Sequence, residues 1–153
     1  MLPRSSQRVA EVIKIANQVA REYEREYVGT EHVLLAVLRE GTGVGAAILE
    51  KRGVTQEKLR VEIERLIKKQ MEETWVFGRL PGTPHFKNVI AVAIGQCQDL
   101  GAREVCTEHI LLALLLEKGC VAYNALKALG LSFNDALADV RDRAAAETKS
   151  KSG

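Results

Sequence analysis

The chain has 153 residues, 46% of them hydrophobic, and a mean hydropathy of -0.07, which is typical of an ordinary folded domain rather than a disordered chain. Its 22 basic and 20 acidic side chains are interspersed and leave a net charge of +2, so there is no basic stripe to attract nucleic acid. No apolar run approaches the roughly 18–20 residues of a membrane span, and the N-terminus lacks the apolar core of a signal peptide. We therefore expect a cytoplasmic protein without a nucleic-acid or membrane partner.

The cysteine and histidine counts argue against a metal site. Cys97, Cys106 and Cys120 form no C-x-x-C pair, and the chain holds only three histidines. An odd number of scattered thiols fits a reducing compartment. The sequence thus predicts no metal and no cofactor.

The first predicted element is an amphipathic helix that begins after Ser6. Apolar residues recur at spacings of three and four, which places them on one face of a helix. Ser6 is the expected N-cap, because a serine hydroxyl accepts a hydrogen bond from a backbone N–H of the first turn. The predicted buried stripe consists of Val9, Val12, Ile13, Ala16, Ala20 and Tyr23.

The second predicted helix spans 30–40, "TEHVLLAVLRE", and is apolar nearly all round, so we expect it at the centre of the fold. Thr30 stands where an N-cap belongs, and Glu31 falls in the first turn, where a carboxylate meets the positive end of the helix dipole. The glycine-rich "GTGVG" at 41–45 lacks the preceding strand and the Lys-Ser/Thr of a phosphate loop. We interpret it as a turn between helices.

A third helix over about 44–52 is predicted to end at Gly53, a residue suited to the left-handed conformation that closes helices. Thr55 is then expected to cap a fourth helix. The buried stripe of that helix consists of Leu59, Ile63, Leu66 and Ile67.

The whole pattern then recurs. A shift of 77 positions, from Thr30 to Thr107, superimposes residues 6–66 on 83–143 without a gap, and the triplet Thr-Glu-His is repeated together with its leucine-rich run. One register kept for about sixty residues indicates an internal duplication. The second copy therefore predicts the same four helices, with Thr83 as the counterpart of Ser6. The other counterparts are Cys97 for Ala20, Gly130 for Gly53 and Ser132 for Thr55.

These elements predict an all-α fold of two tandem, pseudo-symmetric four-helix repeats packed as one globular unit, with no strand. Each copy of about 65 residues would bury only a marginal core by itself, so the two should pack together. The predicted boundaries are repeat one at about 4–73, a linker at 74–82, repeat two at about 83–145 and a disordered tail at 146–153.

Two copies of V-x-T-E-H-h-L-L-A-h-L, where h is Val, Ile or Leu, lie in register within tandem four-helix repeats. This arrangement resembles the Clp N-terminal domain, the substrate- and adaptor-binding head of the ClpA, ClpC and ClpB AAA+ unfoldases, and is closest to the ClpC-like branch. The resemblance covers about residues 4–145, so 1–153 reads as a single domain of this type.

The resemblance implies a protein-binding module that docks substrates or adaptors for an AAA+ unfoldase. The implied partners are a Clp ATPase or Clp peptidase, adaptor proteins and substrate proteins. The chain has no Walker motif and no catalytic constellation, so we expect a non-catalytic part of an ATP-dependent Clp protease. The alternative is a stand-alone accessory subunit that stabilises a Clp protease complex without recognising substrates.

In the ClpC-like branch, the glutamates of the two T-E-H motifs are implicated in binding phosphoarginine, a degradation mark. Carried over by position, this implies one site formed by Glu31 with Ser6 and another formed by Glu108 with Thr83. Gly29 keeps the family's glycine before the first motif while Cys106 replaces it in the second, so we expect the Glu31 site to be the stronger. The alternative is that both glutamates serve only their helix N-termini.

Overall fold

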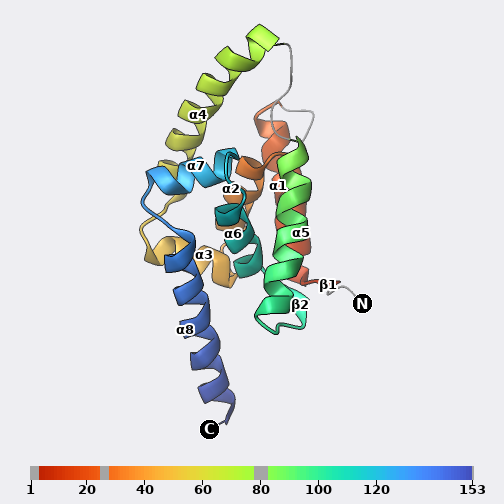
Figure 1. Ribbon diagram of the computed structural model, residues 1–153, viewed down its shortest axis with the longest axis vertical. Helices are drawn as coiled ribbons and strands as arrows, with labels where there is room; N and C mark the ends of the chain where they lie inside the picture. The colour runs from red at the N-terminus through yellow and green to blue at the C-terminus, as the bar shows by residue number, and fades with distance from the viewer. Residues whose placement is uncertain (1–3, 25–27, 78–82, 153) are drawn as a thin grey trace.

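A computed structural model describes the backbone of residues 4–24, 28–77 and 83–152, and the side chains of residues 4–24, 28–66, 85 and 87–144. Within these residues the chain forms eight α-helices and two very short strands (Figure 1). The first repeat holds α1 (Gln7–Glu22), α2 (Thr30–Glu40), α3 (Val44–Lys51) and α4 (Gln56–Phe77). The second holds α5 (Thr83–Asp99), α6 (Thr107–Leu116), α7 (Val121–Ala128) and α8 (Phe133–Ser152). The predicted all-α double repeat is confirmed.

Most predicted helix ends are present. The Ser6 hydroxyl accepts a hydrogen bond from the Val9 N–H at 3.2 Å, which caps α1. The fourth helices are capped in the same way, Thr55 accepting from the Lys58 N–H and Ser132 from the Asp135 N–H, each at 3.2 Å. Gly53 and Gly130 close the third helices with φ values of +78° and +86°, the left-handed region that favours glycine.

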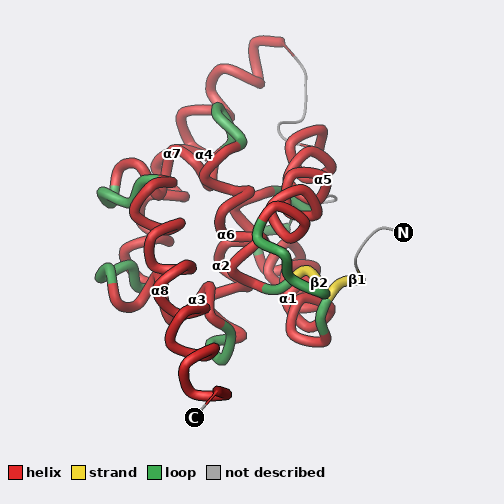
Figure 2. Tube along the Cα trace, turned by 60° about the horizontal axis from the view of Figure 1, so that its bottom comes forward, coloured by secondary structure: helices red, strands yellow, loops and turns green. Residues whose placement is uncertain are grey.

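The prediction of no strand is wrong at one place. The strand β1 (Arg4–Ser5) pairs in parallel with β2 (Glu104–Val105), and the Ser6 N–H extends the pairing to the Val105 carbonyl at 2.8 Å. Each strand leads directly into a helix, and an N-cap residue has extended backbone, so the two entry segments can pair side by side (Figure 2). The pairing fixes the start of α1 beside the start of α6.

Two predicted boundaries also differ from the structure. Residues 74–77, predicted as linker, continue α4 to Phe77, and the tail predicted as disordered from 146 continues α8 to Ser152. No Gly or Pro interrupts either segment before Gly78 or Gly153, and the second contains the strong helix formers alanine, glutamate and lysine. The rest of the predicted linker, 78–82, lies outside the described residues.

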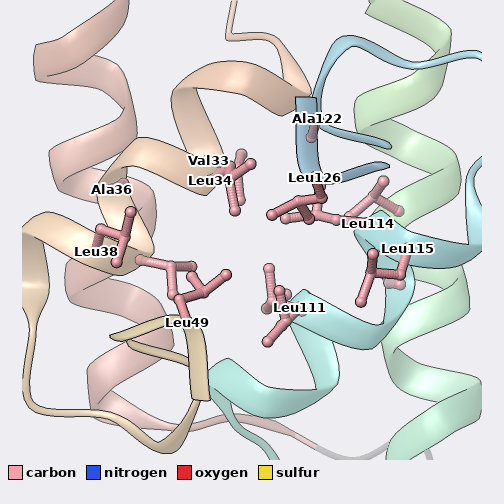
Figure 3. Packing of buried hydrophobic residues seen from close by; sticks show 14 of the residues in the cluster. Val33, Leu34, Ala36, Leu38, Leu49, Leu111, Leu114, Leu115, Ala122 and Leu126 are labelled. Carbon is pink, nitrogen blue, oxygen red and sulfur yellow. The ribbon is translucent and has the colours of Figure 1, made fainter. Parts of the chain in front are cut away.

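The two repeated helices α2 and α6 lie at the centre of the molecule (Figure 1). Every residue at 33–38 and 110–115 is buried. Leucines and small residues of α2, α3, α6 and α7 converge there into one continuous core (Figure 3). As predicted, Cys97 occupies a fully buried position of this core.

The repeats are interlocked rather than merely adjacent. The helix α4 of the first repeat packs against α7 of the second, and α8 of the second packs against α3 of the first. Each fourth helix therefore covers a third helix of the other copy. This arrangement explains how two copies of marginal size form one core.

An ion pair on the buried carboxylate of Asp139 links α3 and α8. Asp139 is 3% exposed and accepts hydrogen bonds from Arg52 Nε at 2.9 Å and Arg52 Nη2 at 3.0 Å, with Lys51 Nζ at 3.4 Å. The Arg52 guanidinium lowers the pKa of the Asp139 carboxyl, with a smaller contribution from Lys51. The carboxylate thus stays charged in the folded protein over most of the pH range.

Asp139→Asn is expected to lower the free energy of unfolding by about 1.5–3 kcal/mol near pH 7, because hydrogen bonds to a charged partner are lost. The folded-state pKa of Asp139 lies below the unfolded value of about 3.9, so its contribution is present above about pH 4 and is lost as the pH falls through the folded pKa. Chemical denaturation at about pH 7 and about pH 2.5 should show the difference between wild type and variant shrinking in acid. A difference independent of pH would mean that the charge of Asp139 contributes nothing.

Within the described residues no single helix is long and apolar enough to cross a membrane. The length and apolar composition of a membrane span are reached only by two consecutive helices added together, α2 with α3 or α6 with α7. The two helices of each pair meet at a sharp bend, of 91° and 90° respectively. Both pairs consist largely of buried core residues.

Candidate functional site

The histidine of each Thr-Glu-His triplet closes the N-terminus of its own helix. The Gly29 N–H donates to His32 Nδ1 at 2.9 Å, and the Cys106 N–H donates to His109 Nδ1 at 2.8 Å. This is one half of a capping box, with histidine in place of the usual Glu or Gln at the third helical position. Neither N-cap residue makes the reciprocal side-chain bond. Burial lowers the pKa of His109, which favours the neutral ring that can accept this bond.

The histidine bonds place the N-caps one residue earlier than predicted. The N-cap residues are Gly29 and Cys106, both with extended backbone, and Thr30 and Thr107 are the first helical residues. The prediction that the two threonines are N-caps is therefore wrong. The sequence pattern does not predict a capping histidine, because the third helical position of a capping box usually holds Glu or Gln.

Each threonine instead binds the other repeat. Thr30 Oγ1 accepts from the Ala122 N–H of α7 at 3.3 Å, and Thr107 Oγ1 accepts from the Gly45 N–H of α3 at 3.0 Å. Gly45 and Ala122 are themselves 77 positions apart, so the two bonds are symmetric counterparts. Each threonine satisfies a first-turn amide that has no partner within its own helix.

The glycines of "GTGVG" make room for this contact. A Cβ atom on Gly43 would clash with Thr107 Oγ1, and one on Gly45 would lie 2.9 Å from the Thr107 carbonyl oxygen. Gly41 provides the turn, with a φ of +75°. The stretch is a close helix–helix contact and a turn, in agreement with its interpretation as structural.

The two glutamates differ in exposure. Glu31 is 5% exposed, and its carboxylate oxygen Oε1 folds into the space that a side chain at Gly29 would fill. In the second copy Cys106 has a side chain at that position, so Glu108 cannot fold back in the same way. Glu108 is half-buried and more open to solvent than Glu31.

Ser6 lies beside the N-terminus of α6, where the second Thr-Glu-His triplet begins. The Ser6 N–H donates to the carbonyl of Val105, the residue before Cys106, at 2.8 Å, and a carboxylate oxygen of Glu108 lies within 4.8 Å of the Cys106 sulfur. The β1–β2 pairing holds the two backbone segments together. The other end of α1, about 24 Å away for 16 residues, carries Tyr23, whose ring stacks on His32 of the first triplet with a centroid distance of 5.9 Å. The implied pairing of Ser6 with Glu31 is therefore wrong, and the chain brings Ser6 to Glu108.

By the symmetry of the two repeats, the counterpart of the Ser6–Glu108 pair would be Thr83 with Glu31. The helix α5 begins at Thr83 and contacts α2, as α1 contacts α6. The side chain of Thr83 lies outside the described residues, so the implied pairing of Thr83 with Glu108 stays a prediction.

Cys106 follows β2 directly, lies next to Glu108 and is half-buried. Burial raises the pKa of its thiol to about 11, and the neighbouring carboxylates of Glu108 and Glu104 add to the effect. Within the described part of the chain, potential ligand atoms of Cys106, Glu108 and His109 lie within 4.8 Å of one another. A metal ion there would have to deprotonate the Cys106 thiol, whose raised pKa disfavours the thiolate. The Nδ1 atom of His109 is already engaged in the helix cap. The absence of a metal site stays a prediction.

The family model of the Clp repeat (R) N-terminal domain matches residues 4–129. The chain belongs to the Clp N-terminal domain family. It is 37% identical over 136 residues to the negative regulator of genetic competence ClpC/MecB of Bacillus subtilis (strain 168), a match that covers 89% of this chain and 16% of that protein. It is 34% identical over 135 residues to the chloroplastic chaperone protein ClpC1 of Oryza sativa subsp. japonica, covering 88% of this chain and 14% of that protein.

The solved structures agree on the fold of this Clp N-terminal domain. The N-terminal domain of the caseinolytic protease associated chaperone ClpD from Arabidopsis thaliana superimposes with a TM-score of 0.69 at 21% identity, covering 92% of this chain and 96% of that one. The double helical repeat is thus shared. This Clp N-terminal domain spans only 14% and 16% of the length of the two ClpC proteins.

Proposed function

We propose that this Clp N-terminal domain is a protein-binding module that docks substrates or adaptor proteins for an AAA+ unfoldase. We further propose that its Ser6–Glu108 site binds phosphoarginine. The observation that carries the second proposal is the meeting of two helix N-termini, those of α1 and α6, at one half-buried carboxylate.

The chemistry of the site suits both halves of that ligand. A carboxylate such as Glu108 can accept two parallel hydrogen bonds from a guanidinium group. The Val9 N–H of α1 donates to the Ser6 hydroxyl, while the amides of Gln7 and Arg8 have no intrahelical partner. No acidic residue in that turn offsets the helix dipole, so a phosphate would be favoured there. Ser6 adds a hydroxyl at the junction.

The structure favours Glu108 over Glu31 as the stronger ligand, the reverse of the order expected from sequence. Glu31 would have to leave the space beside Gly29 before it could bind a guanidinium, and that rearrangement would weaken binding. Gly29, the glycine that the first motif shares with the family, thus favours the conformation in which the Glu31 carboxylate is folded back and buried.

We propose that ATP is hydrolysed by the AAA+ unfoldase and not by this domain. The domain corresponds to a small part of relatives such as the ATP-dependent Clp protease ATP-binding subunit ClpA homolog of Guillardia theta, of which it covers 16%. The accessory-subunit alternative would be favoured if a pull-down with purified Clp ATPase and Clp peptidase retained the peptidase alone.

Glu108→Gln is expected to weaken the binding of free phosphoarginine about ten- to a hundredfold, because a charge-assisted hydrogen-bonded pair of about 1.5–3 kcal/mol is lost. Glu31→Gln, which makes the same change at a buried position, should weaken it far less. Isothermal titration calorimetry on the two variants measures this directly, with circular dichroism to establish that both are folded.

The titrations distinguish a ligand-binding role of the two glutamates from a role restricted to starting their helices. No detectable heat with the wild type at about millimolar ligand would reduce both glutamates to helix-start residues and leave adaptor docking as the function to test. A greater loss with Glu31→Gln than with Glu108→Gln would contradict the proposed order of the sites.

A further inference from the structure

A groove lies on the second repeat, away from the triplets. It is formed by the end of α6, the helix α7 and the start of α8, and its volume is about 390 Å³. Its apolar lining is supplied by Leu115, Tyr123, Leu131 and Phe133, and its basic residues are Lys118 and Lys127. This size suits a few side chains of a peptide rather than a folded domain.

The duplication provides an internal comparison. At the equivalent positions the first repeat carries smaller or more polar residues, and one of them, Arg39, is bound to Glu22 by two hydrogen bonds at 3.0 and 3.1 Å. In the second repeat the counterpart Leu116 is 37% exposed. The fold therefore does not require the apolar and basic residues of the groove. The replacements from first to second copy are Arg39 to Leu116, Gly41 to Lys118, Ala46 to Tyr123, Glu50 to Lys127 and Gln56 to Phe133.

The charge of the groove is not compensated by the side chains that the structure describes. Lys118 and Lys127 are exposed, and neither forms a salt bridge with a described residue. Of the neighbouring acids, Glu117 binds His85 at 2.8 Å. Asp135, together with the stronger effect of Asp139, raises the pKa of Arg52 on α3. An apolar floor with a positive rim is complementary to an apolar side chain next to carboxylates.

We propose that this groove binds a short segment of a partner protein in which one or two large apolar residues are flanked by aspartate or glutamate. The proposal rests on the proposed protein-binding function but assigns it a second surface, separate from the Ser6–Glu108 site. A concave groove between helices suits a peptide better than the flat surface of a bilayer.

The test is fluorescence anisotropy with a fluorescein-labelled hexapeptide of sequence EDLFDE. Lys118→Glu/Lys127→Glu should weaken binding at least about tenfold, since two attractions become repulsions. The matched control is Lys14→Glu/Lys87→Glu, which makes the same charge change at exposed lysines of α1 and α5 and should leave binding unchanged. Leu116→Arg/Phe133→Gln, which installs first-repeat residues, should also weaken binding at least about tenfold while circular dichroism shows a folded protein.

Several results would overturn the proposal. They are no binding by the wild type at about millimolar protein, equal affinity for the basic peptide KKLFKK, and equal loss in the control variant. Preferential binding to anionic phosphatidylglycerol vesicles, or self-association that Lys118→Glu/Lys127→Glu abolishes, would assign the groove to a membrane or a second copy instead. Titration of the same variants with phosphoarginine reports separately on the Ser6–Glu108 site, so failure at one surface is distinguished from failure at the other.

Discussion

Leu35→Ala and Leu112→Ala are each expected to lower the free energy of unfolding by about 2–5 kcal/mol. The two leucines occupy matching positions in the central helices α2 and α6, and they are 2% and 0% exposed. Each is surrounded by other helices of the core, so the space left by the lost atoms cannot be filled by solvent or by a simple shift of a surface side chain. Equilibrium denaturation in urea, with circular dichroism at the helical band, measures the change.

A suitable control is Val61→Ala on α4, where the side chain is 64% exposed and the expected change is within about 0.5 kcal/mol. A loss below about 0.5 kcal/mol at both leucines would mean that α2 and α6 are not central to the folded state. A large loss at only one would show that the two repeats contribute unequally to the core.

Replacing both threonines of the triplets, as Thr30→Val/Thr107→Val, is expected to cost about 2–6 kcal/mol of stability. Valine keeps the shape of threonine but removes the hydroxyl, which leaves the Ala122 and Gly45 amides buried without their acceptors. Each orphaned amide costs about 1–3 kcal/mol, and the two sites share no atoms, so their effects should add. Denaturation of the two single variants and the double variant tests this.

Thr30→Ser/Thr107→Ser is the matched control, because serine retains the hydroxyl and loses only a methyl group. It should be closer to wild type than the valine variant is. The opposite order, with serine more damaging than valine, would mean that the threonine methyl groups rather than the hydrogen bonds stabilise the interface between repeats.

The helices could be predicted from sequence because their signals are local. Spacing of apolar residues, a serine or threonine before a helix and a glycine after it each act within about one turn of the chain. The positions of Ser6, Thr55 and Ser132 and the left-handed Gly53 and Gly130 agree with the structure for that reason. The buried slot of Cys97 followed from the duplication.

The site could be predicted only in part because its contacts are distant in sequence. The threonine bonds join residues separated by 92 and 62 positions, and no local rule distinguishes such a threonine from an N-cap. The pairing of Ser6 with Glu108 depends on two-residue strands too short to leave a sequence pattern. The burial of Glu31 depends on Gly29, which has no side chain and so leaves room for the Glu31 carboxylate. The sequence contains this glycine, but no sequence rule connects it to the burial of the glutamate.

The crossed threonine bonds and the exchanged fourth helices have a consequence for how the two copies can change over time. A substitution at Thr107 is constrained by the glycines at 43 and 45, and one at Thr30 by the residues at 120 and 122, so each copy sets limits on the divergence of the other. The same reciprocity governs unfolding. Opening either copy exposes the amides and apolar surface of its neighbour, so we expect the duplicated chain to melt as one cooperative unit, with neither half persisting when the other opens.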